Sequence, residues 1–104
     1  MGDFVKVAGA GDLSEGEMML VEVGDERLLL ANVGGSFYAI GEVCPHEEGP
    51  LSEGYLEAAE VECPWHGSLF DVRTGENTGP PVAEPVPVYP VRVEGDDILV
   101  GPAL

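Results

Sequence analysis

Basic residues are scarce in this sequence. It has four Lys and Arg against twenty Asp and Glu in 104 residues, which gives a formal net charge of −16. A surface of this sign repels nucleic-acid phosphates and anionic lipid headgroups, so we expect no nucleic acid and no membrane among the partners. A protein with a basic docking face is a better candidate. The acidic residues also favour solubility, and net charge alone does not separate these two roles.

Long apolar runs are also lacking. No stretch approaches the roughly 20 apolar residues that a membrane-spanning helix needs. The first residues do not show the basic region and apolar run of a signal peptide. We therefore expect a cytoplasmic protein, and in that compartment a pair of cysteines more often binds a metal than forms a disulfide.

The composition leaves little room for long helices. Fifteen Gly and nine Pro interrupt the chain often, which favours short strands joined by turns. The length allows one domain over residues 1–104 with one modest core. These features predict an all-β protein.

Strand signals occupy both ends of the chain. Around the turn signals Gly24-Asp25 and Gly34-Gly35, apolar runs predict an antiparallel meander with strands at 18–23, 27–33 and 36–40. The run Leu28-Leu29-Leu30 lies in a segment too short for a helix. Further strands are expected around 4–7, within 86–93 and at 98–100. The prolines before and within the 86–93 segment restrict it to a sheet edge or irregular structure: Pro85, Pro87 and Pro90.

The middle of the chain, about residues 42–84, has a different character. It holds both Cys, both His, the only Trp and a high density of turn residues. Such a loop-rich segment between strand-rich flanks indicates a functional insertion. We expect a β-sandwich base made of residues 1–41 and 85–104, with the insertion as a small binding subdomain.

Every Cys and His belongs to one constellation. Cys44-Pro45-His46 is followed, after residues 47–62, by Cys63-Pro64-Trp65-His66. Thiolates and imidazoles are metal ligands, and four of them with none left over predict a metal site. The prolines stiffen both loops because each fixes one backbone angle. Two similar loops, each offering one thiolate and one imidazole, suit a two-iron cluster with two different iron sites.

Zinc is the main competitor for these ligands. Structural Cys2His2 zinc sites usually pair Cys with Cys and His with His along the chain, whereas here each loop offers one of each. The order of the Cys and His residues along the chain argues against zinc without excluding it. A disulfide between Cys44 and Cys63, with two incidental histidines, is the remaining alternative.

The spacing Cys-x-His followed by Cys-x-x-His resembles the signature of Rieske iron–sulfur proteins. The resemblance extends through 66–71 and 74–75 to the Gly79-Pro80-Pro81 loop. It implies one [2Fe–2S] cluster, with Cys44 and Cys63 on the inner iron and with His46 and His66 on the outer iron. The third loop, which contains Pro80, would cover the cluster.

Departures from the respiratory members of this family bear on the reduction potential. Those members carry a disulfide between the cluster loops, whereas the equivalent positions here are Gly49 and Trp65. They also carry a tyrosine that donates a hydrogen bond to a ligand sulfur, where this chain has Phe70. Ser68 keeps a hydroxyl for a bridging sulfide, and Trp65 is expected to pack over its loop. We expect a potential in the lower part of the Rieske range of about −150 to +300 mV.

The resemblance further implies a ferredoxin rather than an enzyme. Such a protein passes single electrons from a flavoprotein reductase to a terminal oxygenase, as in ring-hydroxylating dioxygenase systems. The chain is too short to hold an oxygen-activating iron domain as well. Two other interpretations stay open: the small Rieske-like subunit of an assimilatory nitrite reductase, and a structural zinc-binding module.

Overall fold

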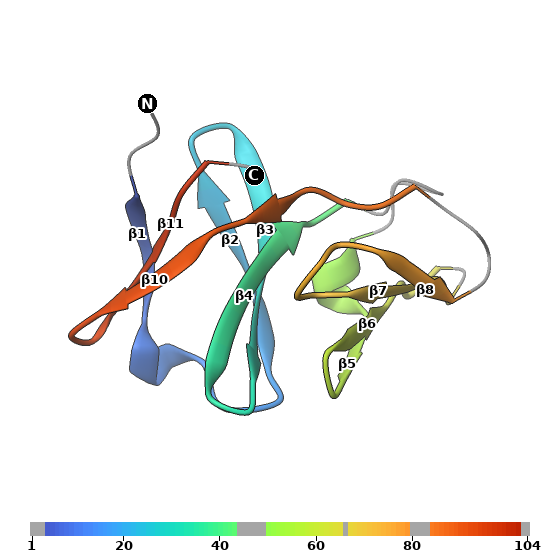
Figure 1. The fold of residues 1–104 in the computed structure, drawn as a ribbon, viewed down its shortest axis with the longest axis horizontal. Coiled ribbons are helices and arrows are strands. Elements are labelled where there is room, and N and C mark those ends of the chain that lie inside the picture. The colour runs from blue at the N-terminus through green and yellow to red at the C-terminus, as the bar shows by residue number, and fades with distance from the viewer. Residues whose placement is uncertain (1–3, 44–49, 66, 80–83, 103–104) are drawn as a thin grey trace.

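The chain folds into three antiparallel sheets, which Figure 1 shows from the side. The structure, a computed structural model, describes residues 4–43, 50–65, 67–79 and 84–102. In these ranges the helical elements are two single 3-10 turns, η1 (Ala10–Asp12) and η2 (Leu51–Glu53). None of the described helices is long and apolar enough to cross a membrane. The predicted all-β class is confirmed.

One sheet is the predicted meander with a short strand added at its edge. Its strands run in the order β2-β3-β4-β9: β2 (Met18–Val23), β3 (Glu26–Val33), β4 (Ser36–Gly41) and β9 (Val88–Tyr89). The two predicted turns fall between β2 and β3 and between β3 and β4. Gly24 and Gly34 both have φ of +61°, which glycine adopts without steric cost.

A second sheet brings the N-terminal and C-terminal strands together. Its order is β1-β11-β10: β1 (Val5–Gly9), β10 (Val91–Glu94) and β11 (Asp97–Val100). The proline-rich segment supplies edge strands in both sheets, β9 in one and β10 in the other. The restriction of this segment to sheet edges is therefore confirmed, and its cause is the missing N–H group of proline.

Strand β3 is buried on both of its faces. Leu28 and Leu30 belong to a core cluster that includes Ile98 of the β1-β11-β10 sheet. Leu29 belongs to a second cluster, which includes Phe70 from a different part of the chain. Burial on both faces explains why this strand is a continuous apolar run rather than an alternating one.

A third sheet, β5-β6-β7-β8, is formed entirely by residues between β4 and β9. Each of its strands has three residues: β5 (Tyr55–Glu57), β6 (Glu60–Glu62), β7 (Leu69–Asp71) and β8 (Asn77–Gly79). The sequence indicated loops here and did not indicate these strands. Three residues are too few for an alternating pattern to be recognised, because the signal needs four to eight.

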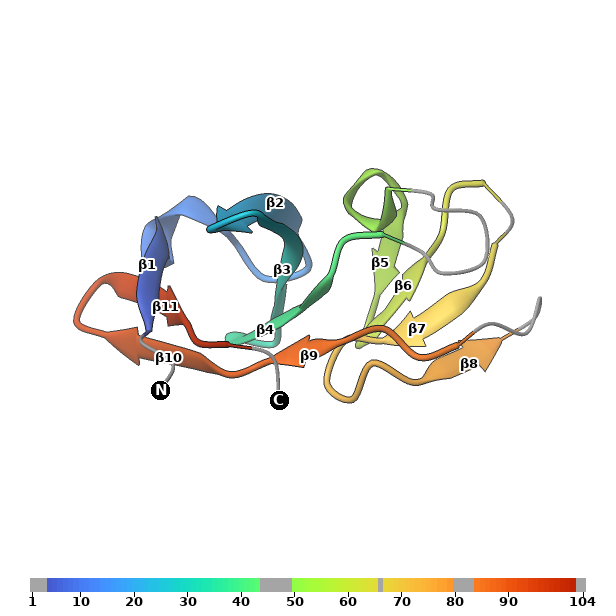
Figure 2. The ribbon, with the colours of Figure 1, turned by 90° about the horizontal axis from the view of Figure 1, so that it is seen from above.

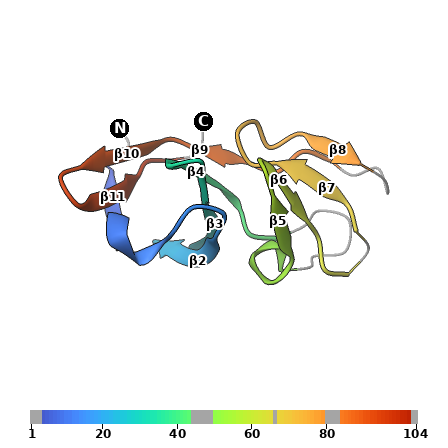
Figure 3. The same cartoon turned by 90° about the horizontal axis from the view of Figure 1, so that it is seen from below.

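The molecule measures 39 × 29 × 18 Å along its principal axes. We call the two sheets of β1–β4 and β9–β11 the base, and η2 with β5–β8 the insert. Figures 2 and 3 show the base and the insert at opposite ends of the long axis, with β9 running between them. The insert packs on the base through Leu51, Val61 and Phe70, which share a core cluster with Leu29 and Ile40.

Candidate metal centre

The first predicted ligand loop has a well-defined base. Val43 and Pro50 form an isolated antiparallel bridge, and the Leu51 N–H donates to the Glu42 carbonyl at 2.9 Å. The predicted ligands Cys44 and His46 lie outside the described residues, as does everything from 44 to 49. The structure thus fixes where this loop leaves the fold and where it returns.

The second predicted ligand loop connects β6 to β7 as a tight hairpin. The Cys63 N–H donates to the Ser68 carbonyl at 2.8 Å, and the Gly67 N–H donates to the Cys63 carbonyl at 3.0 Å. Gly67 has φ of +78°, a conformation that residues with a side chain rarely adopt. Cys63 is a free cysteine, 1% exposed. His66 lies outside the described residues.

The segment that follows the first loop packs directly against the second loop. A Cβ atom added to Gly54 would overlap the carbonyl oxygen of Glu62 and would lie 3.0 Å from Cδ of Pro64. Only a residue without a side chain allows this approach of the two backbones. The segment just after the first loop is therefore held against the start of the second loop, and Leu51 shares a core cluster with Cys63.

The predicted neighbours of the metal differ in their burial. Ser68 and Phe70 are fully buried, and Phe70 is the largest of the fully buried side chains in the described residues. Trp65 is 58% exposed, and its packing over the loop stays a prediction. Pro80 lies outside the described residues.

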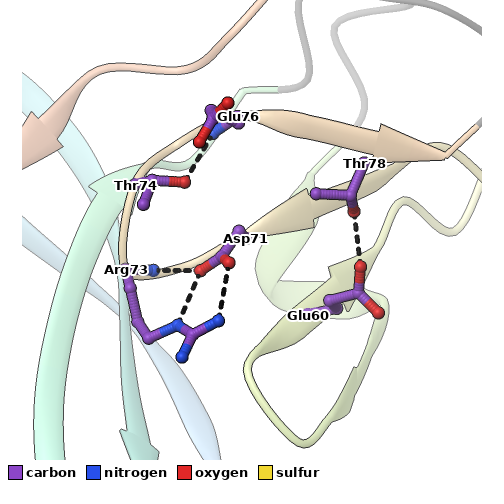
Figure 4. Close-up of polar contacts among 6 residues, drawn as sticks. All are labelled: Glu60, Asp71, Arg73, Thr74, Glu76 and Thr78. Carbon is purple, nitrogen blue, oxygen red and sulfur yellow. Dashed lines mark hydrogen bonds and ion pairs between the residues drawn. The ribbon is translucent and has the colours of Figure 1, made fainter.

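The turn between β7 and β8 is held by a network of polar contacts, drawn in Figure 4. Arg73 donates from Nε and Nη2 to the two carboxylate oxygens of Asp71 at 3.1 and 2.9 Å. Its side chain thereby lowers the pKa of Asp71. The Glu76 N–H donates to Oγ1 of Thr74 at 3.3 Å, so Glu76 joins this turn through its backbone.

A second contact in Figure 4 links two strands of the insert. Thr78 of β8 donates from Oγ1 to a carboxylate oxygen of Glu60 in β6 at 2.6 Å. Both the turn and this link stiffen the sheet that carries the second loop.

Sequence reasoning missed two features of the site. One is Gly54, whose close approach depends on a fold that brings distant segments together. The other is Glu42, a buried carboxylate two residues before Cys44, which contacts Ser52. Neither a single glycine nor a Glu and a Ser ten residues apart gives a recognisable signal in one sequence.

A small all-β protein with two Cys/His motifs in its sequence belongs to the class of metalloproteins. Comparison with known proteins identifies the family within that class. The family model of the Rieske [2Fe–2S] domain matches residues 3–90. The chain is 46% identical over 95 residues to the "Biphenyl 2,3-dioxygenase, ferredoxin component" of Rhodococcus jostii (strain RHA1), with 91% of this chain and 89% of that protein covered. The chain therefore belongs to the Rieske [2Fe–2S] domain family.

Solved structures agree with this assignment. The ferredoxin of carbazole 1,9a-dioxygenase from Nocardioides aromaticivorans IC177 matches with a TM-score of 0.90 and 39% identity, covering 93% of this chain and 95% of that chain. The complex of reduced oxygenase and oxidized ferredoxin in carbazole 1,9a-dioxygenase contains a chain that matches with a TM-score of 0.88 and 37% identity, covering 93% and 91%. The Rieske resemblance seen in the sequence is confirmed.

The residues of this chain fit the group that the family binds, a [2Fe–2S] cluster. A Rieske centre needs two thiolates and two imidazoles, which is the complete Cys and His content of the sequence. Cys63 is buried and free of a disulfide, on a hairpin that adjoins the base of the first loop. The hydrophobic surroundings of a metal site limit solvent access to it, and the burial of Cys63 fits this role.

Proposed function

We propose that Cys44 and Cys63 hold the inner iron of the cluster and that His46 and His66 hold the outer iron. The observation that carries the proposal is the buried Cys63, which shares a core cluster with Leu51, the residue after Pro50, while Gly54 packs against Glu62 beside it. The family spacing supplies the division between the two irons. The cluster-binding subdomain of this proposal comprises about residues 42–84.

His66→Cys tests the ligand assignment. A thiolate adds one negative charge to the centre, so a variant that still holds a cluster should be reduced at a much lower potential. A redox titration followed by visible absorbance measures the shift. Thr78→Ser is a conservative control in the same sheet and should leave the potential unchanged. An unchanged potential in His66→Cys would remove His66 from the ligand set.

The chain serves as a one-electron carrier between a flavoprotein reductase and a terminal oxygenase. Its relatives are named as ferredoxin components of dioxygenases, and one is solved together with an oxygenase. When bound, the cluster supplies a one-electron redox couple. The chain itself provides the buried position of Cys63 in a core cluster and the hydrogen-bonded loop bases from which the ligands extend.

The polar groups near the second loop favour a low potential. Phe70 fills the core position where a tyrosine would donate to a ligand sulfur, and its ring carries no hydroxyl. Ser68 is the hydroxyl that this loop retains. Hydrogen bonds to the sulfurs raise the potential, so the loss of one donor places it in the lower part of the Rieske range.

The charge of the subdomain defines the partner that it fits. Residues 42–84 contain ten Asp or Glu and one basic residue, Arg73, whose charge is paired with Asp71. Two large side chains stand exposed on this acidic background, Trp65 at 58% and Tyr55 at 69%. This combination fits a partner with a basic rim and an apolar centre, since charge steers the encounter and aromatic side chains anchor it.

Electron transfer at varied ionic strength tests the function. The reduced protein is mixed with biphenyl 2,3-dioxygenase lacking its own ferredoxin component, and oxidation of the cluster is followed by stopped flow. We expect single-electron oxidation whose second-order rate falls as salt rises, because salt screens the acidic surface. A rate independent of salt would assign the acidic residues to solubility alone.

Two other functions predict different results. A structural zinc-binding module would be colourless and would contain zinc in place of iron. The small subunit of an assimilatory nitrite reductase would hold a cluster but would support nitrite reduction instead of oxygenase turnover. The names of the relatives favour the oxygenase system.

A further inference from the structure

The proposed electron-carrier function assigns no role to Glu42. Its side chain is 3% exposed, and it is the one buried acidic residue in the described part of the chain. An isolated buried carboxylate is unfavourable because it loses its hydration. The groups that surround Glu42 therefore need to compensate for that loss.

Ser52 provides this compensation with two donors. The Ser52 N–H donates to Oε1 of Glu42 at 2.9 Å, and the Ser52 hydroxyl donates to Oε2 at 2.6 Å. An ionised carboxylate accepts at both oxygens, and contacts of this length are typical of charge-assisted hydrogen bonds. Both donors come from the single 3-10 turn η2.

The backbone of Glu42 adds two further contacts at the same point. Its N–H donates to the carbonyl of Arg27 in β3 at 3.2 Å, and its carbonyl accepts from the N–H of Leu51 at 2.9 Å. Glu42 thus joins a strand of the base to the first turn of the insert. Its contacts with Leu51 and Ser52 join the chain before the first predicted loop to the chain after it.

The backbone of Glu42 lies near that of a proposed cluster ligand, because the two residues are close in the chain. Glu42 is two residues before Cys44, so the Cα atoms of the two residues are at most about 7 Å apart. A buried negative charge is screened much less than an exposed one. Reduction adds a negative charge to the cluster, so a buried carboxylate at this range opposes reduction.

We propose that Glu42 is a positioning residue for the first cluster loop, which it clamps through Ser52, and that its buried charge lowers the reduction potential. This inference rests on the proposed ligation by Cys44. It assigns two separable effects to one side chain. The hydrogen bonds hold together the chain segments before and after the first cluster loop, and the charge sets part of the potential.

Two substitutions separate these effects. Glu42→Gln removes the charge but keeps the shape and an acceptor for the Ser52 N–H, and the Ser52 hydroxyl can turn to accept from the new amide. We expect it to retain the cluster and to raise the midpoint potential. Glu42→Asp keeps the charge but is one methylene shorter, so it cannot hold both Ser52 contacts. We expect a potential near that of the unmodified protein and faster loss of the cluster.

Exposed Glu53, the residue after Ser52, provides the matched control. Glu53→Gln changes the net charge by the same amount as Glu42→Gln, but from a position in water. Potentials are measured by a redox titration followed by absorbance, and cluster loss is measured as bleaching in excess chelator. The shift in Glu42→Gln should exceed the shift in Glu53→Gln.

The outcomes distinguish this inference from the proposed function. Equal potentials in the two Gln variants would overturn the electrostatic part, and bleaching of Glu42→Asp at the unmodified rate would overturn the clamp. If Glu42→Gln does not retain its cluster, Ser52→Ala decides, because the clamp requires it to bleach faster than the unmodified protein. An unmodified protein without any iron–sulfur spectrum would contradict the proposed function itself.

Discussion

The base and the insert are both antiparallel, but they are built from strands of different length. The meander strands β2, β3 and β4 have six to eight residues, whereas each strand of the insert has three. Long ladders and the core between its two sheets stabilise the base, and the insert covers the other face of β3. Three-residue strands give few ladder hydrogen bonds, so the insert depends on packing against the base and on contacts between its loops.

The base and the insert also differ in the space around their glycines. A Cβ atom at Gly24 in the base would meet nothing within 4 Å, so only the backbone angle calls for glycine there. A Cβ atom at Gly54 in the insert would overlap the backbone of Glu62. The turn of the base therefore has room for an added methyl group. In the insert, the segment after the first ligand loop contacts the second loop so closely that no extra atom fits.

The largest effect is expected from Gly54→Ala. The new methyl group would push the segment after the first loop away from Glu62, which separates the two loop bases. We expect the variant to lose most of its cluster while the base stays folded, as measured by iron content and circular dichroism. Gly24→Ala, the control in the base, should cost about 1–2 kcal/mol and leave the iron content unchanged. Full iron content in Gly54→Ala would contradict the close packing of the loops.

Neighbouring leucines in β3 compare the two cores directly. Leu29 faces the insert and Leu30 faces the β1-β11-β10 sheet, and both are fully buried. Truncation of either to Ala should lower the free energy of unfolding by about 2–5 kcal/mol, because each leaves a cavity. Urea unfolding measures this loss.

Cluster retention should separate the two leucine variants. Leu29→Ala loosens the support of the insert and should bleach faster in chelator than Leu30→Ala at the same temperature. The comparison is made well below both melting temperatures, so that global unfolding does not contribute. Equal bleaching rates would mean that the insert does not depend on this face of β3.

The smallest effect is expected from two ion pairs with the same spacing along the chain. Asp71 and Arg73 in the insert make two side-chain contacts, whereas Arg92 and Glu94 in the base make one at 3.4 Å between exposed groups. Asp71→Asn should reduce stability at neutral pH more than Glu94→Gln, which should be close to neutral. Unfolding of the two variants in low salt measures the difference.

The pH dependence of the Asp71→Asn effect has a definite sign. The Arg73 side chain lowers the pKa of Asp71 in the folded protein below its ordinary value of 3.8. Its contribution to stability is therefore fully present above pH 3.8 and is lost as the pH falls through the lowered pKa. The unmodified protein and Asp71→Asn should differ at pH 6 and converge in strong acid. If the difference in stability between the two proteins grew on acidification, it would contradict a lowered pKa of Asp71 in the folded protein.

The sequence predicted the base better than the insert, for a physical reason. In the base, local signals agree with the fold: turn glycines lie between long apolar runs, and the prolines of 85–90 mark edge strands. The triple leucine was correctly interpreted as a strand because the flanking turns leave no room for a helix. Short-range patterns suffice where strands pair with their neighbours in the chain.

In the insert, the ligand motif was recognisable but its support was not. Cys and His are rare enough that their spacing carries information. Gly54 contacts Glu62, eight positions later, at the open end of the hairpin of β5 and β6. Glu42 contacts Ser52, ten positions later, across the ends of the first loop. Such contacts follow from the three-dimensional packing of the loops and leave no periodic trace in the sequence.

The most direct test of the central claim is a low-temperature EPR spectrum of the purified protein, reduced anaerobically with dithionite and analysed for metal. A two-iron cluster with mixed Cys and His ligation should give a rhombic signal that integrates to about one spin per chain, with two irons and no stoichiometric zinc. A colourless, EPR-silent protein with one zinc per chain would contradict the electron-carrier function and leave a structural metal module.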